Sequence, residues 1–285
     1  MFRKLSLTAA IALALTAGQA TAAEVETEIT DYDFTFEGPF GSYDQMQLQR
    51  GLQVYTEICA GCHGLEYVAF RNLSDDGGPG LPEEQMRAYA EFYEVFDQSL
   101  FDGEGDFRPA TPADKFPESS LSNAPDLSLM AKARAGFSGP YGTGISQFVN
   151  GMGGAEYIAS LMTGYHEEPE CALEGEPMDG FYNVAFAAGG FPESCKDENG
   201  KHKVPGSWIA MSQPLWGDDV EFADGASADI ESVSQDVAAF LMWTAEPKLM
   251  ARKQAGLTGV LFLTVLSVLL YLTNKRLWAP HKNKE

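Results

Sequence analysis

The sequence predicts a mainly α-helical domain with long irregular connections, followed by one membrane-spanning helix near the C-terminus. Residues 254–274 read QAGLTGVLFLTVLSVLLYLTN and carry no charge. At about 1.5 Å per residue this run measures roughly 31 Å as a helix, which is enough to cross a bilayer. Two earlier segments place apolar residues at helical spacing, and the chain between them is rich in glycine and proline without a parallel-strand pattern.

The N-terminus has the three parts of a secretory signal peptide over residues 1–22. Arg3 and Lys4 form a basic start, a short apolar run follows, and small residues lie before the predicted cleavage site. The apolar run has only about 14 residues, fewer than the roughly 20 that a transmembrane helix needs. We therefore predict export of a mature domain that covers residues 23–247.

Two amphipathic segments are the predicted core helices. The first, in residues 43–64, carries on one face Leu48, Leu52, Tyr55 and Ile58. The second, residues 229–247, carries on one face Ile230, Val233, Val237, Phe240 and Leu241. Asp229 or Ser232 is suited to cap its start, and Pro247 ends it.

The C-terminal region is predicted as a linker (248–253), a membrane anchor (254–274) and a short tail (275–285). Four basic residues follow the anchor and two precede it closely, so the positive-inside rule places the tail in the cytoplasm. Together with the signal peptide, this predicts a single-pass protein whose main domain lies outside the cytoplasm.

The predicted mature domain is strongly acidic. Residues 23–247 hold 40 Asp and Glu against 10 Lys and Arg, a formal net charge of −30. Such a charge repels nucleic acid and attracts basic partners, so we expect no nucleic-acid binding. The alternative explanation is that the acidity only maintains solubility.

Four cysteines in an exported chain are expected to be paired or ligated. Cys171 and Cys195 would close a loop of 25 residues, and a disulfide there is worth about 3 kcal/mol in the chain-entropy estimate. We predict this disulfide, which leaves Cys59 and Cys62 to bond to each other or to another group.

Cys59, Cys62 and His63 stand together in the sequence CAGCH. A structural zinc site needs four ligands, and the remaining cysteines and histidines form no second closely spaced pair. A redox dithiol is expected in a βαβ pattern, which is absent from the sequence pattern. Covalent haem needs two thiols for thioether bonds and a histidine next in the chain, so CAGCH predicts one haem c. Gly61 and Gly64 would leave room for the macrocycle.

The second axial ligand decides whether such a haem carries electrons or binds substrates. Met211 lies in VPGSWIAMSQPLWGDD, between an apolar approach and a turn that contains Pro214. A thioether on such a loop is typical of electron-carrying haem proteins. Further methionines lie in loops, and His166 and His202 are the alternative ligands.

Five segments together resemble a known family, in its order and along nearly the whole mature chain: CAGCHGLEYVAFRNL, NAPDLSLMAKAR, AEYIASLMTGY, IAMSQPL and DVAAFLMWTAEPKLMARKQAG. The chain resembles the cytochrome c1 family of the bacterial bc1 complex, in particular its alphaproteobacterial branch. The resemblance implies a class I cytochrome c-like haem domain and Met211 as the second axial ligand. It also implies that the carbonyl of Pro125 orients His63 and that Arg134 and Tyr157 lie near the haem propionates.

Two regions depart from the mitochondrial form of this family. Residues 136–154 and 191–204 look like insertions, and the second begins between the two cysteines of the predicted disulfide. The resemblance therefore assigns the disulfide to a bacterial branch, where it would brace the long segment that ends at Met211.

The resemblance also implies a function and its partners. The chain would be the electron-carrying subunit of a ubiquinol–cytochrome c oxidoreductase in the bacterial inner membrane, with its main domain in the periplasm. It would take electrons from a Rieske iron–sulfur protein and pass them to a soluble, basic-faced cytochrome c, in a dimeric complex with cytochrome b. By itself it would not be an enzyme. The alternatives are a stand-alone membrane-tethered electron shuttle and a haem enzyme with an open sixth position.

Overall fold

The structure is a computed structural model that describes residues 25–134, 153–175 and 177–282. The chain forms two compact units. The main unit comprises Ile29–Tyr165 and the chain from Met211 onward, and the excursion unit comprises His166–Ala210 with the segment that ends at Glu28. The excursion unit has a small core of its own, and the extent of the mature domain, residues 23–247, stays a prediction. The predicted signal peptide and nearly all of the first insertion lie outside the described residues.

Both predicted core helices are present in the main unit. Helix α2 spans Gln45–Val54 and begins at Asp44, whose carboxylate accepts a hydrogen bond from the backbone of Gln47. It continues directly into a π-helical turn, Tyr55–Cys59. Helix α8 spans Ile230–Ala245, and the predicted cap Asp229 accepts from the backbone N–H of Ser232.

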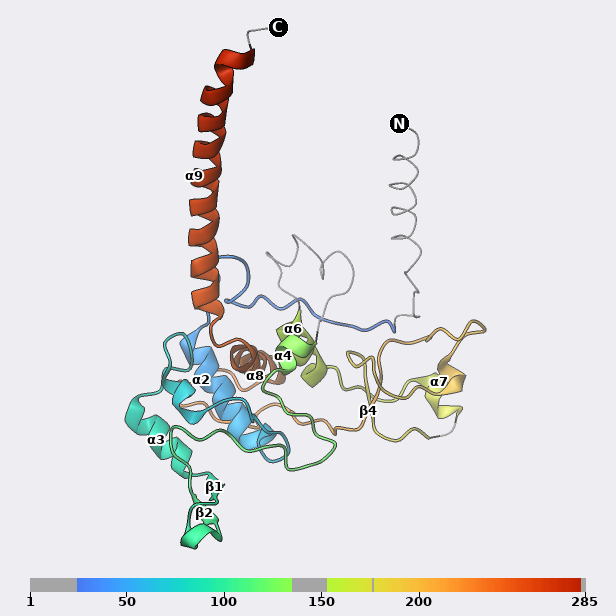
Figure 1. The fold of residues 1–285 in the computed structure, drawn as a ribbon. Coiled ribbons are helices and arrows are strands. Elements are labelled where there is room, and N and C mark those ends of the chain that lie inside the picture. The colour runs from blue at the N-terminus through green and yellow to red at the C-terminus, as the bar shows by residue number, and fades with distance from the viewer. Residues whose placement is uncertain (1–24, 135–152, 176, 283–285) are drawn as a thin grey trace. The chain divides into compact units, whose positions relative to one another are not determined.

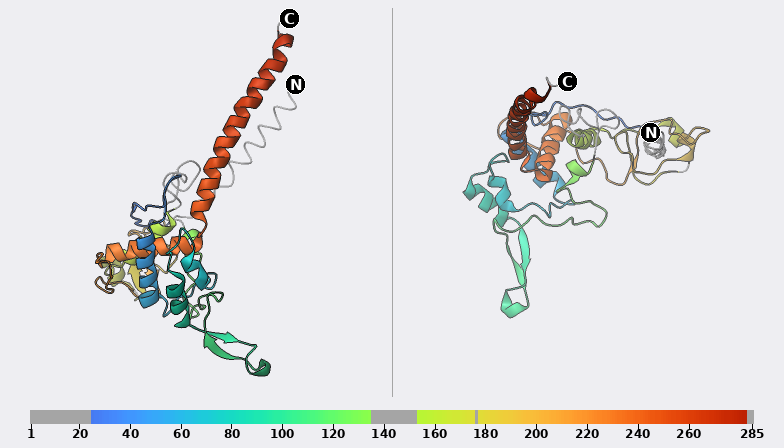
Figure 2. Two further views of the ribbon diagram at one scale, coloured as in Figure 1. Left: turned by 90° about the vertical axis from the view of Figure 1, so that its left-hand side faces the viewer. Right: turned by 45° about the horizontal axis from the view of Figure 1, so that its top comes forward.

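Helices α2 and α8 cross at close range, as Figures 1 and 2 show. A Cβ atom on Gly51 of α2 would lie 2.1 Å from the carbonyl oxygen of Asp236 and 2.6 Å from Cβ of Phe240. Only glycine allows two helix backbones to approach this closely. Beside this contact, Arg50 donates to the buried Asp236 carboxylate at 2.7 Å. The crossing therefore fixes the end of α2 from which the CAGCH segment emerges.

The rest of the main unit consists of short elements around this crossing. Its short helices are a 3-10 turn at Phe70–Ser74, α3 (Glu83–Glu91), α4 (Met130–Ala133) and α6 (Gly154–Thr163). An antiparallel hairpin joins β1 (Glu94–Asp97) to β2 (Asp106–Pro109) in the register Glu94 opposite Pro109, with a 3-10 turn at Phe101–Gly103 between the strands. Figure 1 shows the hairpin projecting beyond α3. The sequence predicted irregular chain here.

The excursion unit is small and built mostly of turns. Its elements are α7 (Glu170–Leu173), β3 (Phe181–Asn183), a 3-10 turn (Glu193–Cys195) and β4 (Ser207–Ile209). Strands β3 and β4 pair antiparallel, with Phe181 opposite Ile209. The buried core of this unit consists of Ala172, Tyr182, Cys195 and Trp208. So small a core needs a covalent brace, which the disulfide described below provides.

The C-terminal helix α9 spans Leu249–Lys282, and its most apolar 18-residue window has a mean hydropathy of 2.2. This confirms an apolar helix long enough to span a membrane. The helix begins before the predicted start and ends after the predicted end, so the predicted linker 248–253 is almost entirely helical. The reason is that LMARKQ contains no helix breaker after Pro247. Leu249 is buried in the main core, and the ammonium of Lys253 donates to the carbonyls of Phe36 and Gly41.

Candidate functional site

The CAGCH segment forms a tight turn directly after the π-helical end of α2. The carbonyl oxygen of Cys59 accepts from the backbone N–H of both Cys62 (3.1 Å) and His63 (2.9 Å). Cys59 is half-buried and Cys62 is exposed, and the two are not bonded to each other. Burial raises the pKa of the Cys59 thiol to about 12. The turn thus presents two unpaired thiols and an imidazole on five consecutive residues.

His63 is held at both its ring and its backbone. Its Nδ1 lies 2.7 Å from the carbonyl oxygen of Pro125. A carbonyl oxygen only accepts hydrogen bonds, so Nδ1 carries a proton, and in the neutral imidazole Nε2 then keeps its lone pair. The hydroxyl of Tyr55 donates to the His63 carbonyl at 3.0 Å. This is the arrangement in which a histidine ligates a metal through Nε2, and the contact with Pro125 is the one that the family resemblance implies.

The segment 117–128 wraps around this turn. The Ser120 hydroxyl donates to the Gly61 carbonyl at 2.7 Å, and the Gly64 N–H donates to the Ser119 hydroxyl at 2.9 Å. A Cβ on Gly64 would lie 2.4 Å from the carbonyl of Pro117, whereas one on Gly61 meets nothing within 4 Å. The space beside Gly64, where a side chain would lie, is thus filled by the backbone of residues 117–119. The prediction that Gly64 leaves this space for a macrocycle is therefore wrong.

Met211 is the first residue of the chain after the excursion. It is half-buried against the main core, and its carbonyl accepts a hydrogen bond from the Tyr165 hydroxyl at 3.1 Å. Two residues on, the Gln213 amide donates to the carbonyl of Leu215 at 2.8 Å, and Leu215 is only 1 % exposed. The backbone at the Met211 carbonyl and directly after it is thus tied to the main unit, to which His63 also belongs.

Arg134 and Tyr157, which the resemblance groups together, are in contact. Arg134 follows α4 and Tyr157 lies in α6, and the guanidinium lies near enough to the phenol to act on its pKa. Burial raises the pKa of Tyr157, while the charge of Arg134 lowers it. Arg134 is exposed, so this pair places a fixed positive charge at the surface of the main unit.

The two alternative histidine ligands lie in the excursion unit. His166 is exposed. His202 stacks on Phe191, with ring centroids 3.5 Å apart and planes within 3°, and burial lowers its pKa. His63, by contrast, lies in the main unit, where Pro125 accepts from its ring and Tyr55 donates to its carbonyl.

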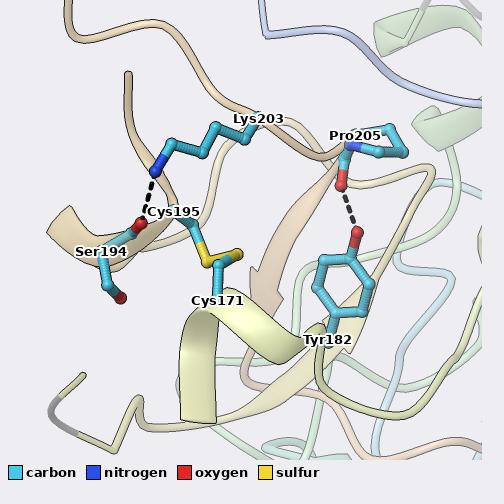
Figure 3. Close-up of a disulfide and its surroundings, with 6 residues drawn as sticks. All are labelled: Cys171, Tyr182, Ser194, Cys195, Lys203 and Pro205. Carbon is cyan, nitrogen blue, oxygen red and sulfur yellow. Dashed lines mark hydrogen bonds between the residues drawn. A yellow bond between two sulfur atoms is a disulfide. The ribbon is translucent and has the colours of Figure 1, made fainter. Parts of the chain in front are cut away.

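The predicted disulfide joins Cys171 of α7 to Cys195, as Figure 3 shows. Beside it, the Lys203 ammonium donates to the Ser194 carbonyl at 3.0 Å. A disulfide between these positions closes most of the excursion into a covalent loop. It therefore restricts the chain that leads into Met211 from the N-terminal side.

Sequence reasoning missed the two tyrosines whose hydroxyls fix the backbones of His63 and Met211. Tyr55 was predicted only as one apolar member of a helix face, and Tyr165 received no role. The helical spacing does predict that Tyr55 faces the core, but the carbonyl that its hydroxyl meets depends on tertiary packing. No local pattern identifies that partner.

Comparison with known proteins decides the family. The sequence profile of the Cytochrome C1 family matches residues 34–281. The chain belongs to the cytochrome c1 family. It is 61 % identical to a protein named cytochrome c1 from Cereibacter sphaeroides over 100 % of this chain and 99 % of that one. It is 50 % identical to a cytochrome c1 from Rhodobacter capsulatus over 98 % of both chains. A protein named cytochrome b/c1 from Bradyrhizobium diazoefficiens is 37 % identical over 86 % of this chain and 35 % of its own length.

Membership of the cytochrome c1 family makes the chain an electron-transfer haem subunit of the bc1 complex. The donor set described above fits haem c. Two unpaired thiols separated by two residues suit two thioether bonds, and a histidine with a free Nε2 lone pair follows at once. The half-buried thioether of Met211 is a soft donor in the same unit.

Proposed function

We propose that this chain carries one covalently bound haem c and transfers single electrons within a ubiquinol–cytochrome c oxidoreductase. Cys59 and Cys62 provide the thioether bonds, and His63 and Met211 are the axial ligands. The observation that carries the proposal is the CAGCH turn in which the Pro125 carbonyl holds the proton on Nδ1 of His63. This leaves Nε2 as the ligand atom.

Each of the other residues has a role that follows from its contacts. When bound, the haem supplies a one-electron redox couple. The Pro125 carbonyl fixes the tautomer of His63 and increases its basicity. The Met211 thioether favours reduced iron and raises the potential. Arg134, held by Tyr157, offers charge to the anionic propionate groups. This assignment includes no bond-making chemistry, so the chain by itself is not an enzyme.

The proposed partners follow from family membership and charge. A Rieske iron–sulfur protein delivers the electron, and a soluble cytochrome c with a basic face receives it. Cytochrome b is the third partner, in a dimeric complex. The name of the Bradyrhizobium relative, cytochrome b/c1, supports the association with cytochrome b. The haem domain faces the periplasm, α9 crosses the inner membrane, and the C-terminus lies in the cytoplasm.

Purification in detergent tests this assignment directly. We expect an affinity tag on the C-terminal tail to recover the haem protein together with a b-type cytochrome and an iron–sulfur protein. Recovery of the haem protein alone, under conditions that keep other membrane complexes intact, would favour a stand-alone tethered shuttle. A five-coordinate haem in the purified protein would instead favour a haem enzyme with an open sixth position.

Loss of the disulfide is expected to act on Met211. The bridge restricts the excursion that precedes the proposed ligand, so Cys171→Ala should weaken the methionine–iron bond and lower the haem potential without preventing haem attachment. Redox titration of the variant measures this. The control is Ser194→Ala, beside the bridge, which leaves both sulfurs in place. Alkylation of both wild-type thiols without reductant would show that the bridge does not form in the cell.

The membrane anchor is expected to be dispensable for the haem core. The sequence places the cut after Lys248, but Leu249 is only 4 % exposed and Lys253 bonds to two backbone carbonyls of the main unit. A chain that ends after Lys253 should therefore be soluble and retain haem. A chain that ends after Lys248 should also retain haem but be less stable by about 1.5–3 kcal/mol, the value of one buried leucine.

Cell fractionation and urea unfolding measure these two effects. Recovery of either truncated chain only in the membrane fraction, after signal cleavage, would contradict a single C-terminal anchor.

A further inference from the structure

The chain leaves the main unit after one residue and returns to it at another, and a hydrogen bond joins these two residues. Tyr165 is the last main-unit residue before the excursion, and Met211 is the first after it. The Tyr165 hydroxyl lies 3.1 Å from the Met211 carbonyl oxygen although the residues are 46 positions apart. A carbonyl only accepts, so the tyrosine donates. This hydrogen bond, called the neck bond below, joins the two ends of the main unit between which the excursion lies.

Tyr165, the donor of the neck bond, is attached to a well-packed helix. Tyr165 follows α6, which packs against α4 and α8. The hydroxyl of Thr163, at the end of that helix, donates to the Ala159 carbonyl one turn earlier and lies 3.4 Å from the Tyr32 hydroxyl. Tyr165 itself is half-buried. A hydrogen bond from this position transmits the rigidity of the helical core to the Met211 backbone.

The methionine side has a fixed point only downstream. Leu215 is buried and its carbonyl is bonded to Gln213. Upstream, the chain runs directly into Ala210 and the rest of the excursion, which is a separate compact unit. Within the described residues, the hydrogen bond from Tyr165 holds the peptide group between Met211 and Ser212, directly after the Met211 Cα, to the main unit.

We propose that Tyr165 is a positioning residue for the second axial ligand. Its hydroxyl fixes the Met211 carbonyl at the point where the chain re-enters the main unit, and so restricts the backbone that carries the thioether. This inference rests on the proposed function, in which Met211 ligates the haem iron.

The test compares two tyrosine-to-phenylalanine variants of the full-length membrane protein. Tyr165→Phe keeps the ring and removes the neck bond. Tyr43→Phe is the matched control, because the Tyr43 hydroxyl also donates to a methionine carbonyl, that of Met242 in α8, at 3.2 Å. Loss of one hydrogen bond should weaken methionine binding to iron about two- to tenfold in Tyr165→Phe.

Two measurements report this weakening. A loss of fold stability alone would change neither of them. The ferrous haem should bind carbon monoxide more readily in Tyr165→Phe, and its midpoint potential should fall, by up to about 59 mV for a tenfold effect. Tyr43→Phe should match the wild type in both. Identical carbon monoxide binding and potential in the two variants would overturn the proposal.

Two further variants separate hydrogen bonding from packing and from the excursion. Tyr165→Gln keeps a donor but loses the ring, so it should bind carbon monoxide less readily than Tyr165→Phe if the bond matters, and more readily if only packing matters. Cys171→Ala should lower the potential more in the Tyr165→Phe background than alone, because the backbone of Met211 would then lose restraints both before and after its Cα. Strict additivity would contradict this coupling.

The outcome with Met211→Leu distinguishes failure of this inference from failure of the proposed function. If Met211→Leu changes neither readout, Met211 is not the ligand and the role of Tyr165 falls with it. If Met211→Leu opens the haem to carbon monoxide while Tyr165→Phe behaves as Tyr43→Phe does, the ligand assignment stands and only the positioning role is wrong.

Discussion

Met211→Leu is expected to keep the covalent haem and to lower its reduction potential steeply. Haem attachment depends on Cys59 and Cys62, which the change does not touch. Methionine–histidine ligation raises the potential of a c-type haem, and each 59 mV lost shifts a one-electron equilibrium tenfold. Leucine has a similar volume, so the half-buried position against the main core should be retained. Redox titration and carbon monoxide binding to the ferrous protein measure the effect.

The matched control for this experiment is Met178→Leu. Met178 is also half-buried and lies in a loop, but it packs against the core of the excursion unit. It should leave the potential unchanged and the iron closed to carbon monoxide. If Met211→Leu behaves as this control does, the ligand must be sought at His166 or His202.

The second large effect concerns the acidity of residues 23–247. If their net charge of −30 steers a basic cytochrome c, the association rate must fall as salt is added. The Debye length shrinks from about 30 Å at 0.01 M salt to about 8 Å at 0.15 M. Electrostatic steering accelerates association by 10 to about 1,000-fold, and this gain should collapse over the same range.

Stopped-flow oxidation by a basic cytochrome c across a salt series measures this rate. An acidic cytochrome of similar potential is the control and should show no such decline. A second-order rate with the basic partner that stays flat from about 10 to 200 mM salt would show that the acidity does not select the partner.

Two exposed acidic clusters are candidates for this docking: Glu167, Glu168 and Glu170 in the excursion unit, and Asp218, Asp219 and Glu221 in the main unit. The second cluster is partly committed to structure, since the Asp219 carboxylate accepts from the backbone N–H groups of Trp216 and Gly217. Charge removal should therefore begin with Glu221 and Asp218. Removal of Asp219 would also disturb the turn after Met211.

The features that the sequence predicts well here are those whose cause is local. The Asp229 cap lies three residues from its partner Ser232, and the uncharged run of α9 needs no tertiary partner to be recognised. CAGCH is similarly self-contained, because five consecutive residues carry the donor set. By contrast, the sequence reading did not foresee that the linker 248–253 continues into α9, although its residues are good helix formers.

What the sequence alone does not predict depends on contacts between distant segments. Tyr165 meets Met211 across 46 positions, and Tyr55 meets a carbonyl that only the CAGCH turn brings within reach. The carbonyl of Pro125 lies 62 positions from His63, and only the family resemblance implied it. The division into two units escaped prediction for the same reason, since a core as small as that of the excursion leaves no periodic pattern in the sequence.

The π-helical turn at Tyr55–Cys59 makes this part of the chain sensitive to changes of length. A π turn contains one residue more than an α turn, closed here by the bond from the Ala60 N–H to the Tyr55 carbonyl at 2.8 Å. Deleting one residue would restore regular α-helical bonding and improve the helix locally. It would also rotate the following residues by about 100° about the helix axis relative to the buried face of α2. At this position a chain shorter by one residue would therefore gain a better helix, but its whole CAGCH segment would be turned away from its present direction relative to the buried face of α2.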